Sequence, residues 1–530
     1  MGAPGSITKR QTRKVFDLSI IRRRMLGLLT LIVLLVPFTQ VQAFEIMETT
    51  IDEIHAAFTS GELSCTQLVQ GYLDRIEAYD KQGPAINAIQ TVNPNALSEA
   101  AVLDAAFASG GLVGPLHCIP VLVKDQVEVA GMPTTYGSAI FKDFIPERDA
   151  TIVTRMKEAG AIILAKTNMG EFASGYRGSA FGVCRNPYDP ARHPSSSSCG
   201  TGAAVAANFG TVGIAEDTGG STRGPASHGG AVGLRPTTQL ISRFGMMPAT
   251  PTRDTLGPLT RTVRDAAILT DVIAGYDPND PITAYSVGNI PESYTDFLDV
   301  NGLQGARIGV IREPMAGNAR PDSEGYAQVQ AIVDQAVEEM RALGAEVVDP
   351  LSIPDLLALL DVGGGSSETE EAVNAYLKRH PNAPVSTFRE IAVSDLVVPS
   401  RRNSLLNALN RSTSDPAYLQ SLANRETLRR VILQVMADYE LDAIVYPTFS
   451  HPPGLIEDNT PGSNRTLSPA IGFPALTVPA AFTDDGLPVG IDIMGRPFSE
   501  GMLFKFGYAY EQGTHHRRPP SFTPALTAAP

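Results

Sequence analysis

The segment from residue 176 to residue 260 is rich in Gly, Ser, Thr and Pro, a composition that ordinarily indicates loops or a linker. Three short apolar runs interrupt it, at residues 203–209, 212–215 and 231–234. A flexible linker has no need of such runs. We therefore expect this segment to form part of a core in which small residues let neighbouring backbones approach closely.

Helical and strand-like patterns alternate on both sides of this segment. Apolar residues recur at helical spacing in 66–79, with Ser64 at the N-cap position, and a helical pattern in 150–158 precedes the apolar run 161–165. Further helices are expected at 51–58, 96–107, 328–343, 386–396 and 416–439, and further strands at 119–123, 345–348, 443–446, 475–478 and 489–494. This alternation predicts an α/β fold with a mixed, largely parallel central sheet covered by helices on both faces.

The chain length of 530 residues alone would allow about two to four domains. No internal repeat is visible in the sequence. We expect one catalytic domain over residues 44–530, with a more variable middle section at about 267–440.

Residues 1–43 are typical of an export signal. Seven basic residues and one acidic residue give them a net charge of +6, and they include the apolar run 25–38. This run has 14 residues, fewer than the ~20 that span a bilayer, and Val41-Gln42-Ala43 resembles a cleavage site. We expect cleavage near Ala43 and a periplasmic or extracellular location. An uncleaved anchor and a misassigned start codon are the alternatives.

The charge and the cysteines narrow the possible partners and cofactors. Because the whole chain carries −14, residues 44–530 carry −20, which argues against nucleic acid as a partner. No later run is long and apolar enough to predict stable membrane insertion. Cys118 is expected to be a buried free thiol, whereas a disulfide between Cys184 and Cys199 remains open. No CxxC or HExxH motif is present, so we expect no metal.

Three segments carry residues with catalytic potential, and each also has a structural interpretation. Lys124 ends the apolar run 119–123, where a lysine often snorkels or pairs with an acid. The four serines at 195–198 also suit the N-cap of the alanine-rich helix that follows. In Thr218-Gly219-Gly220-Ser221, the two glycines let the backbone aim its N–H groups at one point, as a site for a phosphate or an oxyanion requires.

A serine nucleophile also needs a base. The chain has no GxSxG motif, and His228, the histidine near Ser221 in sequence, is equally well interpreted as a packed residue. A lysine can serve as the base when a buried setting leaves it neutral. We therefore expect Lys124 to be buried with no acid paired to it, and a second hydroxyl to relay the proton.

Taken in order, these segments resemble the amidase signature family. Its run close to G-G-S-S-G-G-S corresponds to 195–201, its D-T-G-G-S-I-R to 217–223, and its P-A-x-x-x-G-x-x-G-L-K-P to 225–236. Further similar stretches are 114–125, 134–138, 166–173, 185–188, 474–479 and 486–490. The resemblance covers roughly residues 50–515 and is specific, because several spaced motifs occur in the right order.

The resemblance implies the amidase signature fold and a Ser–Ser–Lys triad. In it, Lys124 is the base, Ser197 is the proton bridge with a cis peptide, and Ser221 is the nucleophile that forms the acyl-enzyme. The implied oxyanion hole consists of the backbone N–H groups of Thr218, Gly219, Gly220 and Ser221. The implied supporting residues are Ser198, which holds a neighbouring hydrogen bond, and Asp217 and Arg223, which brace the loop.

The serine-rich run departs from the family pattern. Ser195 and Ser196 replace two glycines, Cys199 replaces another, and Thr201 replaces a serine. If either position before Ser197 needs a positive φ, a serine is strained there. The three triad residues themselves are intact.

The implied reaction is hydrolysis of a small-molecule or peptide amide, which releases ammonia or an amine and needs no cofactor. The motifs do not distinguish aliphatic, aryl, peptide C-terminal, fatty-acid or carbamate-like substrates, and they do not determine the oligomeric state. Two alternatives remain. One is a non-catalytic binding protein on the same scaffold. The other is the amidase subunit of a tRNA-dependent amidotransferase, against which export argues because charged tRNA is cytosolic.

Overall fold

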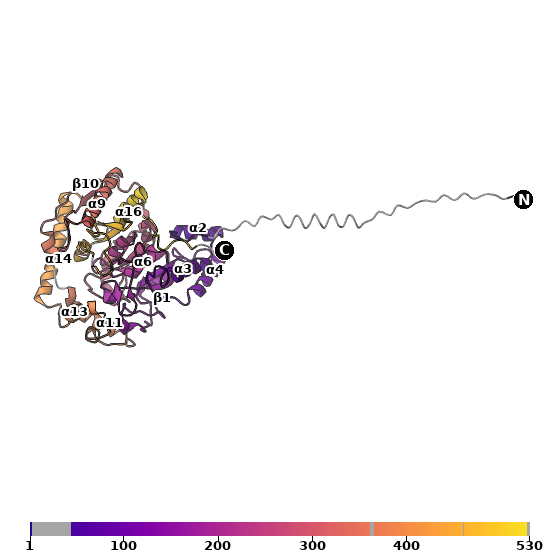
Figure 1. The fold of residues 1–530 in the computed structure, drawn as a ribbon, viewed down its shortest axis with the longest axis horizontal. Helices are drawn as coiled ribbons and strands as arrows, with labels where there is room; N and C mark the ends of the chain where they lie inside the picture. The colour runs from indigo at the N-terminus through magenta and orange to yellow at the C-terminus, as the bar shows by residue number, and fades with distance from the viewer. Residues whose placement is uncertain (3–43, 361–364, 459, 527–530) are drawn as a thin grey trace. The chain divides into compact units, whose positions relative to one another are not determined.

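The computed structural model describes residues 1–2, 44–360, 365–458 and 460–526 (Figure 1). The predicted export signal therefore lies outside the described residues, apart from its first two. Every element below belongs to the unit Glu45–Pro530. Within the described ranges, no helix combines the length and the hydrophobicity needed to cross a bilayer.

The strands and helices alternate along most of the chain, as the sequence predicted. The strands are β1 Ile89–Val92, β2 Pro120–Lys124, β3 Ile162–Thr167, β4 Arg177–Gly178, β5 Gly182–Val183, β6 Val212–Glu216, β7 Val232–Arg235, β8 Leu256–Thr260, β9 Arg307–Val310, β10 Glu346–Val348, β11 Ala443–Pro447, β12 Ala475–Phe482 and β13 Pro488–Met494. The α-helices are α2 Ile51–Ser60, α3 Cys65–Tyr79, α4 Ala96–Gly110, α5 Thr151–Glu158, α6 Cys199–Ala206, α7 Arg223–His228, α8 Val263–Ile273, α9 Glu324–Ala342, α10 Leu356–Leu360, α11 Thr369–Leu377, α12 Phe388–Ala392, α13 Pro399–Ala408, α14 Pro416–Asp438, α15 Leu467–Ile471 and α16 Glu500–Thr514.

Eleven strands form one mixed sheet in the order β1-β3-β2-β6-β8-β7-β12-β13-β11-β9-β10. Parallel pairs occur in two blocks, β3–β2–β6 and β11–β9–β10. Antiparallel pairs through β8, β7, β12 and β13 join the two blocks. Helices flank the sheet (Figure 1), so the predicted mixed α/β sheet covered by helices is confirmed.

The central strands β2 and β6 determine where the candidate site lies. They are parallel neighbours in which Val123 pairs with Ile214, and every residue of both strands is buried. Their carboxyl ends therefore lie at the same edge of the sheet, where open α/β sheets bind their ligands. Lys124 ends β2, and Glu216 ends β6.

The small-residue segment forms a close-packed core, as its composition predicted. All residues of α6 and α7 are buried. A Cβ atom added at Gly202 in α6 would lie 2.6 Å from the Cβ of Pro225 in α7. Because real Cβ contacts are never that short, the two helices can approach one another only with glycine at this position.

The helix predicted at 386–396 is wrong in its length. The structure has the five-residue helix α12 there, from Phe388 to Ala392. Shortly after it, the Ser394 hydroxyl accepts a hydrogen bond from the backbone N–H of Leu396 at 3.2 Å. A serine that bonds its neighbouring backbone in this way offers an alternative to helix continuation.

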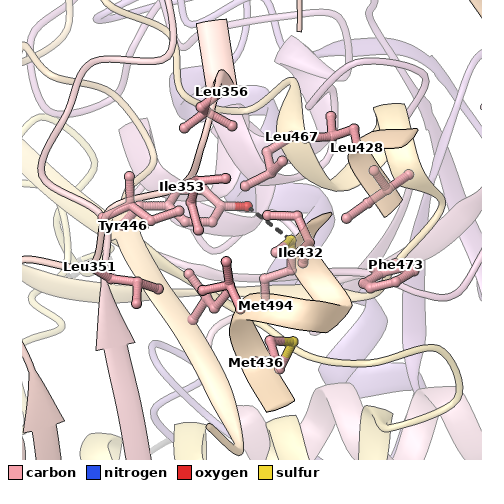
Figure 2. Packing of buried hydrophobic residues seen from close by; sticks show 14 of the residues in the cluster. Leu351, Ile353, Leu356, Leu428, Ile432, Met436, Tyr446, Leu467, Phe473 and Met494 are labelled. Carbon is pink, nitrogen blue, oxygen red and sulfur yellow. Dashed lines mark hydrogen bonds between the residues drawn. The ribbon is translucent and has the colours of Figure 1, made fainter. Parts of the chain in front are cut away.

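A buried apolar cluster fixes the C-terminal part of the sheet. Figure 2 shows Leu428, Ile432 and Met436 of α14 in this cluster together with Tyr446 of β11 and Met494 of β13. Leu467 and Ile471 of the short helix α15 belong to the same cluster. Burial of each such side chain stabilises the fold by about 1.5–3 kcal/mol, so the cluster also fixes the segment that precedes α15.

The cysteines correct one prediction. Cys118 is not a free thiol: it forms a disulfide with Cys65, with the Cα atoms 5.7 Å apart. The bond joins the first residue of α3 to the segment immediately before β2, a pairing that the sequence does not reveal because 53 positions separate the two residues. Cys184 and Cys199 are buried free thiols.

Candidate active site

Lys124 lies at the carboxyl end of β2 with its side chain fully buried. Its Nζ is 2.9 Å from the Ser197 Oγ. The sequence-predicted base and proton bridge are therefore in direct hydrogen-bond contact. Ser197 is itself 1% exposed, so this contact is shielded from bulk water.

The expectation that no acid pairs with Lys124 is wrong. The Glu216 Oε2 lies 2.8 Å from the Lys124 Nζ, and both side chains are fully buried. The backbone oxygen of Glu216 lies 3.5 Å from the same nitrogen. The parallel register of β2 and β6 brings the two residues together at one sheet edge, an adjacency that 92 residues of sequence separation conceal.

The serine-rich run enters α6 through an unusual backbone. The peptide bond between Ser196 and Ser197 is cis, and Ser195 has a φ of 68°. Left-handed backbone costs a non-glycine residue about 1–2 kcal/mol, so the strain expected from the replaced glycine falls on Ser195. Two contacts offset it: the Ser195 N–H donates to the His193 Nδ1 at 3.2 Å, and the Ser195 Oγ accepts from Arg465 at 3.3 Å.

The other departures in this run fit their surroundings. Cys199 is buried at the start of α6, where its thiol lies 3.7 Å from the Asn168 backbone oxygen. The Thr201 hydroxyl shares a hydrogen bond with the Thr167 hydroxyl at 2.7 Å. Ser198 donates to the Glu216 backbone oxygen at 3.1 Å, which links the serine-rich run to the end of β6.

The loop after β6 carries Ser221 and a group of backbone donors. The N–H groups of Thr218, Gly219 and Ser221 donate to no acceptor within the described part of the chain. The Gly220 N–H, by contrast, donates to the Asp217 Oδ1 at 2.6 Å. The Gly220 N–H is thus engaged within the loop, whereas the other three amides are open to an acceptor; the oxyanion hole itself stays a prediction.

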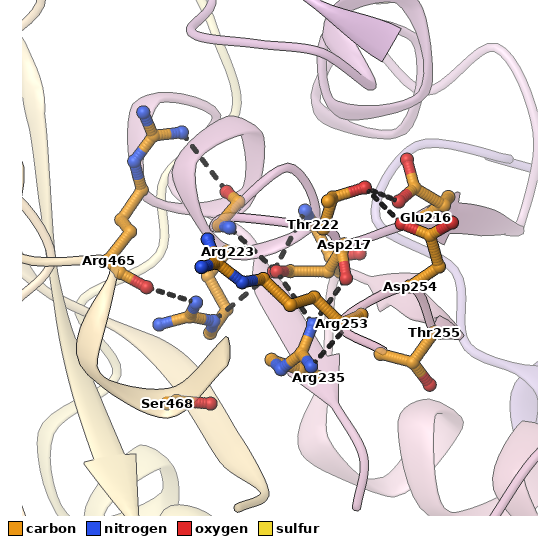
Figure 3. A network of polar contacts seen from close by, with 12 residues as sticks. Glu216, Asp217, Thr222, Arg223, Arg235, Arg253, Asp254, Thr255, Arg465 and Ser468 are labelled. Atoms are coloured by element: carbon orange, nitrogen blue, oxygen red, sulfur yellow. Dashed lines mark hydrogen bonds and ion pairs between the residues drawn. The ribbon is translucent and has the colours of Figure 1, made fainter. Parts of the chain in front are cut away.

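The Asp217 carboxylate fixes the conformation of this loop through several contacts. Besides Gly220 it accepts from the Thr222 N–H at 3.2 Å, and it pairs with Arg223 at 3.3 Å and Arg235 at 3.1 Å (Figure 3). Burial raises the pKa of Asp217, but the two guanidinium groups and the amide donors outweigh burial and bring that pKa far below its ordinary value. The loop is thus built around a permanently charged carboxylate.

Arg465 connects the serine-rich run to the loop that carries Ser221. The sequence did not predict this residue as part of the site. Its Nη1 donates at 3.1 Å both to the backbone oxygen of Ser196 and to that of Gly220, the residues immediately before Ser197 and Ser221. Gly220 has a φ of 103°, and a Cβ there would lie 2.2 Å from the Arg465 Cβ. Burial lowers the pKa of Arg465 to about 10, so the side chain is still a cation at neutral pH.

The two serines are not hydrogen-bonded to one another. Ser221 is half-buried, and its hydroxyl has no hydrogen bond among the residues that the structure describes. Hydrogen bonds of catalytic groups are often long in the free enzyme and shorten when substrate binds. The Ser221 hydroxyl is therefore accessible to a ligand, whereas Ser197 and Lys124 are not.

His228 is a packed residue and not a base for Ser221. It is 1% exposed, its ring centre lies 4.4 Å from that of Phe449, and neither ring nitrogen has a hydrogen-bond partner in the described chain. Burial lowers the pKa of His228 far below its ordinary value.

A cavity of about 250 Å³ reaches the Ser221 loop at Thr218. Its walls are mostly apolar and include Met169, Phe172, Met247, Val373, Phe388 and Leu405. Most of these belong to a second apolar cluster, to which α11, α12 and α13 contribute, and Figure 1 shows α11 and α13 as neighbours. One cation, Arg401, also lines the cavity, and its Nε donates to the Glu171 backbone oxygen at 3.0 Å.

Comparisons with known proteins find relatives that cover most of the chain. The family model described as Amidase matches residues 67–504. The native peptide amidase of Stenotrophomonas maltophilia has a similar structure, with a TM-score of 0.81 and 36% identity over 90% of this chain and 99% of that one. The A subunit of the glutamyl-tRNA(Gln) amidotransferase of Heliobacterium modesticaldum is 33% identical over 89% of this chain and 98% of its own length. A probable amidase of Arabidopsis thaliana is 34% identical over 90% of this chain and 92% of its own length.

Proposed function

The chain belongs to the amidase family and is an amide-hydrolysing enzyme, and from this premise we propose that Ser221 is its nucleophile, Ser197 its proton bridge and Lys124 its base. The observation that carries the proposal is the buried contact of 2.9 Å between the Lys124 Nζ and the Ser197 Oγ. The contact joins the lysine amine at the end of β2 to a hydroxyl of the serine-rich run, and these two groups can exchange a proton.

The proposed steps follow from these contacts. Neutral Lys124 takes the proton of Ser197, and Ser197 takes that of Ser221 as the Ser221 oxygen attacks the amide carbon. The N–H groups of Thr218, Gly219 and Ser221 hold the oxyanion, and each such donor contributes about 3–4 kcal/mol in comparable sites. Ammonia or an amine leaves with a returned proton, and water then hydrolyses the ester.

Labelling with a fluorophosphonate tests the nucleophile. We expect the label on the peptide that contains Ser221, no label on Ser221→Ala, and retention of the wild-type melting temperature by that variant. The variant should have less than about a hundredth of the wild-type rate. A protein that neither takes the label nor hydrolyses any amide in a broad panel would be a binding protein on the same scaffold.

We further propose that the substituent of the amide that enters the cavity is apolar. The support is the cavity's wall of methionine, phenylalanine and branched side chains next to Thr218. A pocket of this kind gains about 0.8 kcal/mol for each methylene group that it buries. An amide with a phenyl or branched alkyl substituent should therefore have a much higher kcat/KM than acetamide.

A matched pair of variants tests the cavity. Val373→Phe fills it, whereas Val373→Ala enlarges it. We expect Val373→Phe to lower kcat/KM for the bulky amide about 10- to 200-fold while acetamide turnover changes little. Equal effects on both substrates would contradict the assignment of this cavity to the substrate.

We also propose that the protein is exported and cleaved near Ala43. The basic and apolar residues before that position support this proposal, and so does the Cys65–Cys118 disulfide, since such bonds persist mainly in oxidising compartments. A role within an amidotransferase is a weaker proposal, because export separates the protein from cytosolic charged tRNA.

N-terminal sequencing of protein from its native host tests the export proposal. We expect Phe44 as the first residue and activity in the fraction outside the cytoplasm. An intact segment 1–43 in the membrane fraction would favour an anchored enzyme instead.

A further inference from the structure

A single hydroxyl lies between two buried carboxyl groups beside Lys124. The Thr218 Oγ1 contacts the Glu216 Oε1 and lies 2.7 Å from the Asp254 Oδ1, and Figure 3 shows Glu216 and Asp254 next to one another. A hydroxyl supplies one hydrogen, and ionised carboxylates only accept. Two hydrogen bonds among these three oxygens therefore require that one of the two carboxyl groups carries a proton.

The surroundings of the two acids differ. Asp254 accepts hydrogen bonds from the backbone N–H groups of Ala249 at 2.8 Å and Thr250 at 2.9 Å, which suit a carboxylate. The other oxygen of Glu216 faces Lys124. Burial and the neighbouring Glu216 carboxyl raise the pKa of Asp254 to about 6, so the two acids do not both ionise readily and share one proton up to about pH 6.

Other charged groups also face this pair. Arg235 on β7 interacts electrostatically with Glu216, and Arg253 and Arg243 interact with Asp254. These cations favour a net negative charge on the pair, which is the charge it has when it holds one proton. The pair is therefore suited to carry one proton and one negative charge.

We propose that Glu216, Thr218 and Asp254 form a reversible hydrogen-bond chain that compensates the charge on Lys124 during acyl transfer. This proposal rests on the proposed roles of Lys124 and Ser197. In the resting enzyme, the Glu216 carboxyl donates to Thr218, and Thr218 donates to the Asp254 carboxylate. Neutral Lys124 donates its two hydrogens to the side chain and the backbone oxygen of Glu216, which leaves its lone pair directed at Ser197.

The chain reverses when Lys124 takes the proton from Ser197. The O–H bond of Glu216 breaks as its proton moves to the Thr218 oxygen, and Thr218 passes its own hydrogen to Asp254, where a new O–H bond forms. No proton enters or leaves the chain. The new ammonium group now faces a Glu216 carboxylate, and return of the proton to the leaving amine restores the first state.

This arrangement avoids two costs. An ammonium ion without a counter-charge is expensive in a buried site. A Glu216 that was always ionised would instead hold Lys124 as ammonium and prevent it from accepting a proton. The chain supplies the carboxylate only in the state in which Lys124 is charged, so Glu216 is a positioning and charge-compensating residue.

Two variants should move the pH–rate profile in opposite directions. Thr218→Val removes the hydroxyl but keeps the backbone N–H; Glu216 then stays ionised, and the pH of half-maximal acylation rate should rise by roughly one unit or more. Glu216→Gln removes the carboxylate, so this pH should fall, and the plateau rate should drop at least about ten-fold because the ammonium lacks its counter-charge. Thr218→Ser, the matched control, should keep the wild-type midpoint.

Acylation is measured with an activated anilide under single-turnover conditions, and thermal unfolding verifies that each variant is folded. Thr218→Ala replaces Thr218→Val if the latter does not fold. Shifts of Thr218→Val and Glu216→Gln in the same direction, no shift in either, or a Thr218→Ser profile like that of Thr218→Val would overturn the chain. In any of these cases, a wild type that is active and labelled on Ser221 means that only the proposal of the hydrogen-bond chain is wrong. A wild type that is neither active nor labelled means that the proposed function is wrong.

Discussion

Removal of the Cys65–Cys118 disulfide should destabilise the enzyme by about 4 kcal/mol. The two cysteines are 53 positions apart, and closing a loop of that length removes about 14 cal/mol/K of entropy through the length-dependent part and the fixed part together. At about 25 °C the loss corresponds to roughly 4 kcal/mol. Both residues are almost fully buried, with 1% and 0% exposure, so replacement by the smaller alanine adds a modest packing loss.

The assay is urea unfolding of the wild type and of Cys65→Ala/Cys118→Ala, each with and without dithiothreitol. We expect the reductant to lower the unfolding midpoint of the wild type and to leave that of the double variant unchanged. Cys184→Ala, which removes a free buried thiol, is the control and should respond to the reductant as the wild type does. In unfolded, unreduced wild type, only the thiols of Cys184 and Cys199 should titrate. Titration of all the cysteines in protein from the native host, or a wild-type midpoint insensitive to the reductant, would refute the reasoning.

Three further outcomes can be measured. Lys124→Ala and Ser197→Ala should each lower kcat by orders of magnitude, and the double variant should be little worse than either, since relay residues act as a unit; multiplicative losses would exclude the relay. Arg465→Met should lower kcat at least about ten-fold, with partial recovery in Arg465→Lys, and equal rates for both would exclude Arg465 as a link between the loops. Asp254 has its pKa raised from the ordinary 3.8 to about 6, so its contribution to stability is present below pH ~4 and is lost as the pH rises through ~6. We therefore expect the free energy of unfolding of Asp254→Asn, relative to that of the wild type, to increase by up to roughly 3 kcal/mol between pH 4 and pH 7. Urea unfolding at both pH values measures this, and a difference independent of pH would contradict the raised pKa.

Most of the helices and strands could be predicted because apolar spacing and capping residues lie within each element itself. The helix 66–79 with its Ser64 cap is present as α3, and the Ser64 side chain accepts from the Gln67 N–H. The run before Lys124 forms the buried strand β2. The helix predicted at 386–396 is too long, because apolar spacing does not show that the Ser394 side chain accepts a hydrogen bond from the backbone beyond the end of α12.

The contacts around the site depend on strand register and could not be predicted in this way. Glu216 reaches Lys124 only because β2 and β6 are parallel neighbours with a particular pairing. Arg465 comes from a segment 245 residues after Gly220, and nothing in its local sequence distinguishes it from a surface arginine. The sequence thus pointed to Lys124 and Ser197, which the structure brings into contact, but not to the charged groups that surround them.

Those surrounding charges explain how a glycine-rich loop can present its donors in a fixed geometry. Asp217 pairs with Arg223 and Arg235, and Arg223 also pairs with Asp492 on β13 at 2.5 Å. All four side chains are fully buried, where an isolated charge would cost several kcal/mol. Because removal of one member leaves the others uncompensated, the loop cannot move without breaking the network. The proposed oxyanion donors are therefore held by buried ion pairs that connect the loop to β7 and β13, and the positive φ of Gly220 determines their geometry without making the loop mobile.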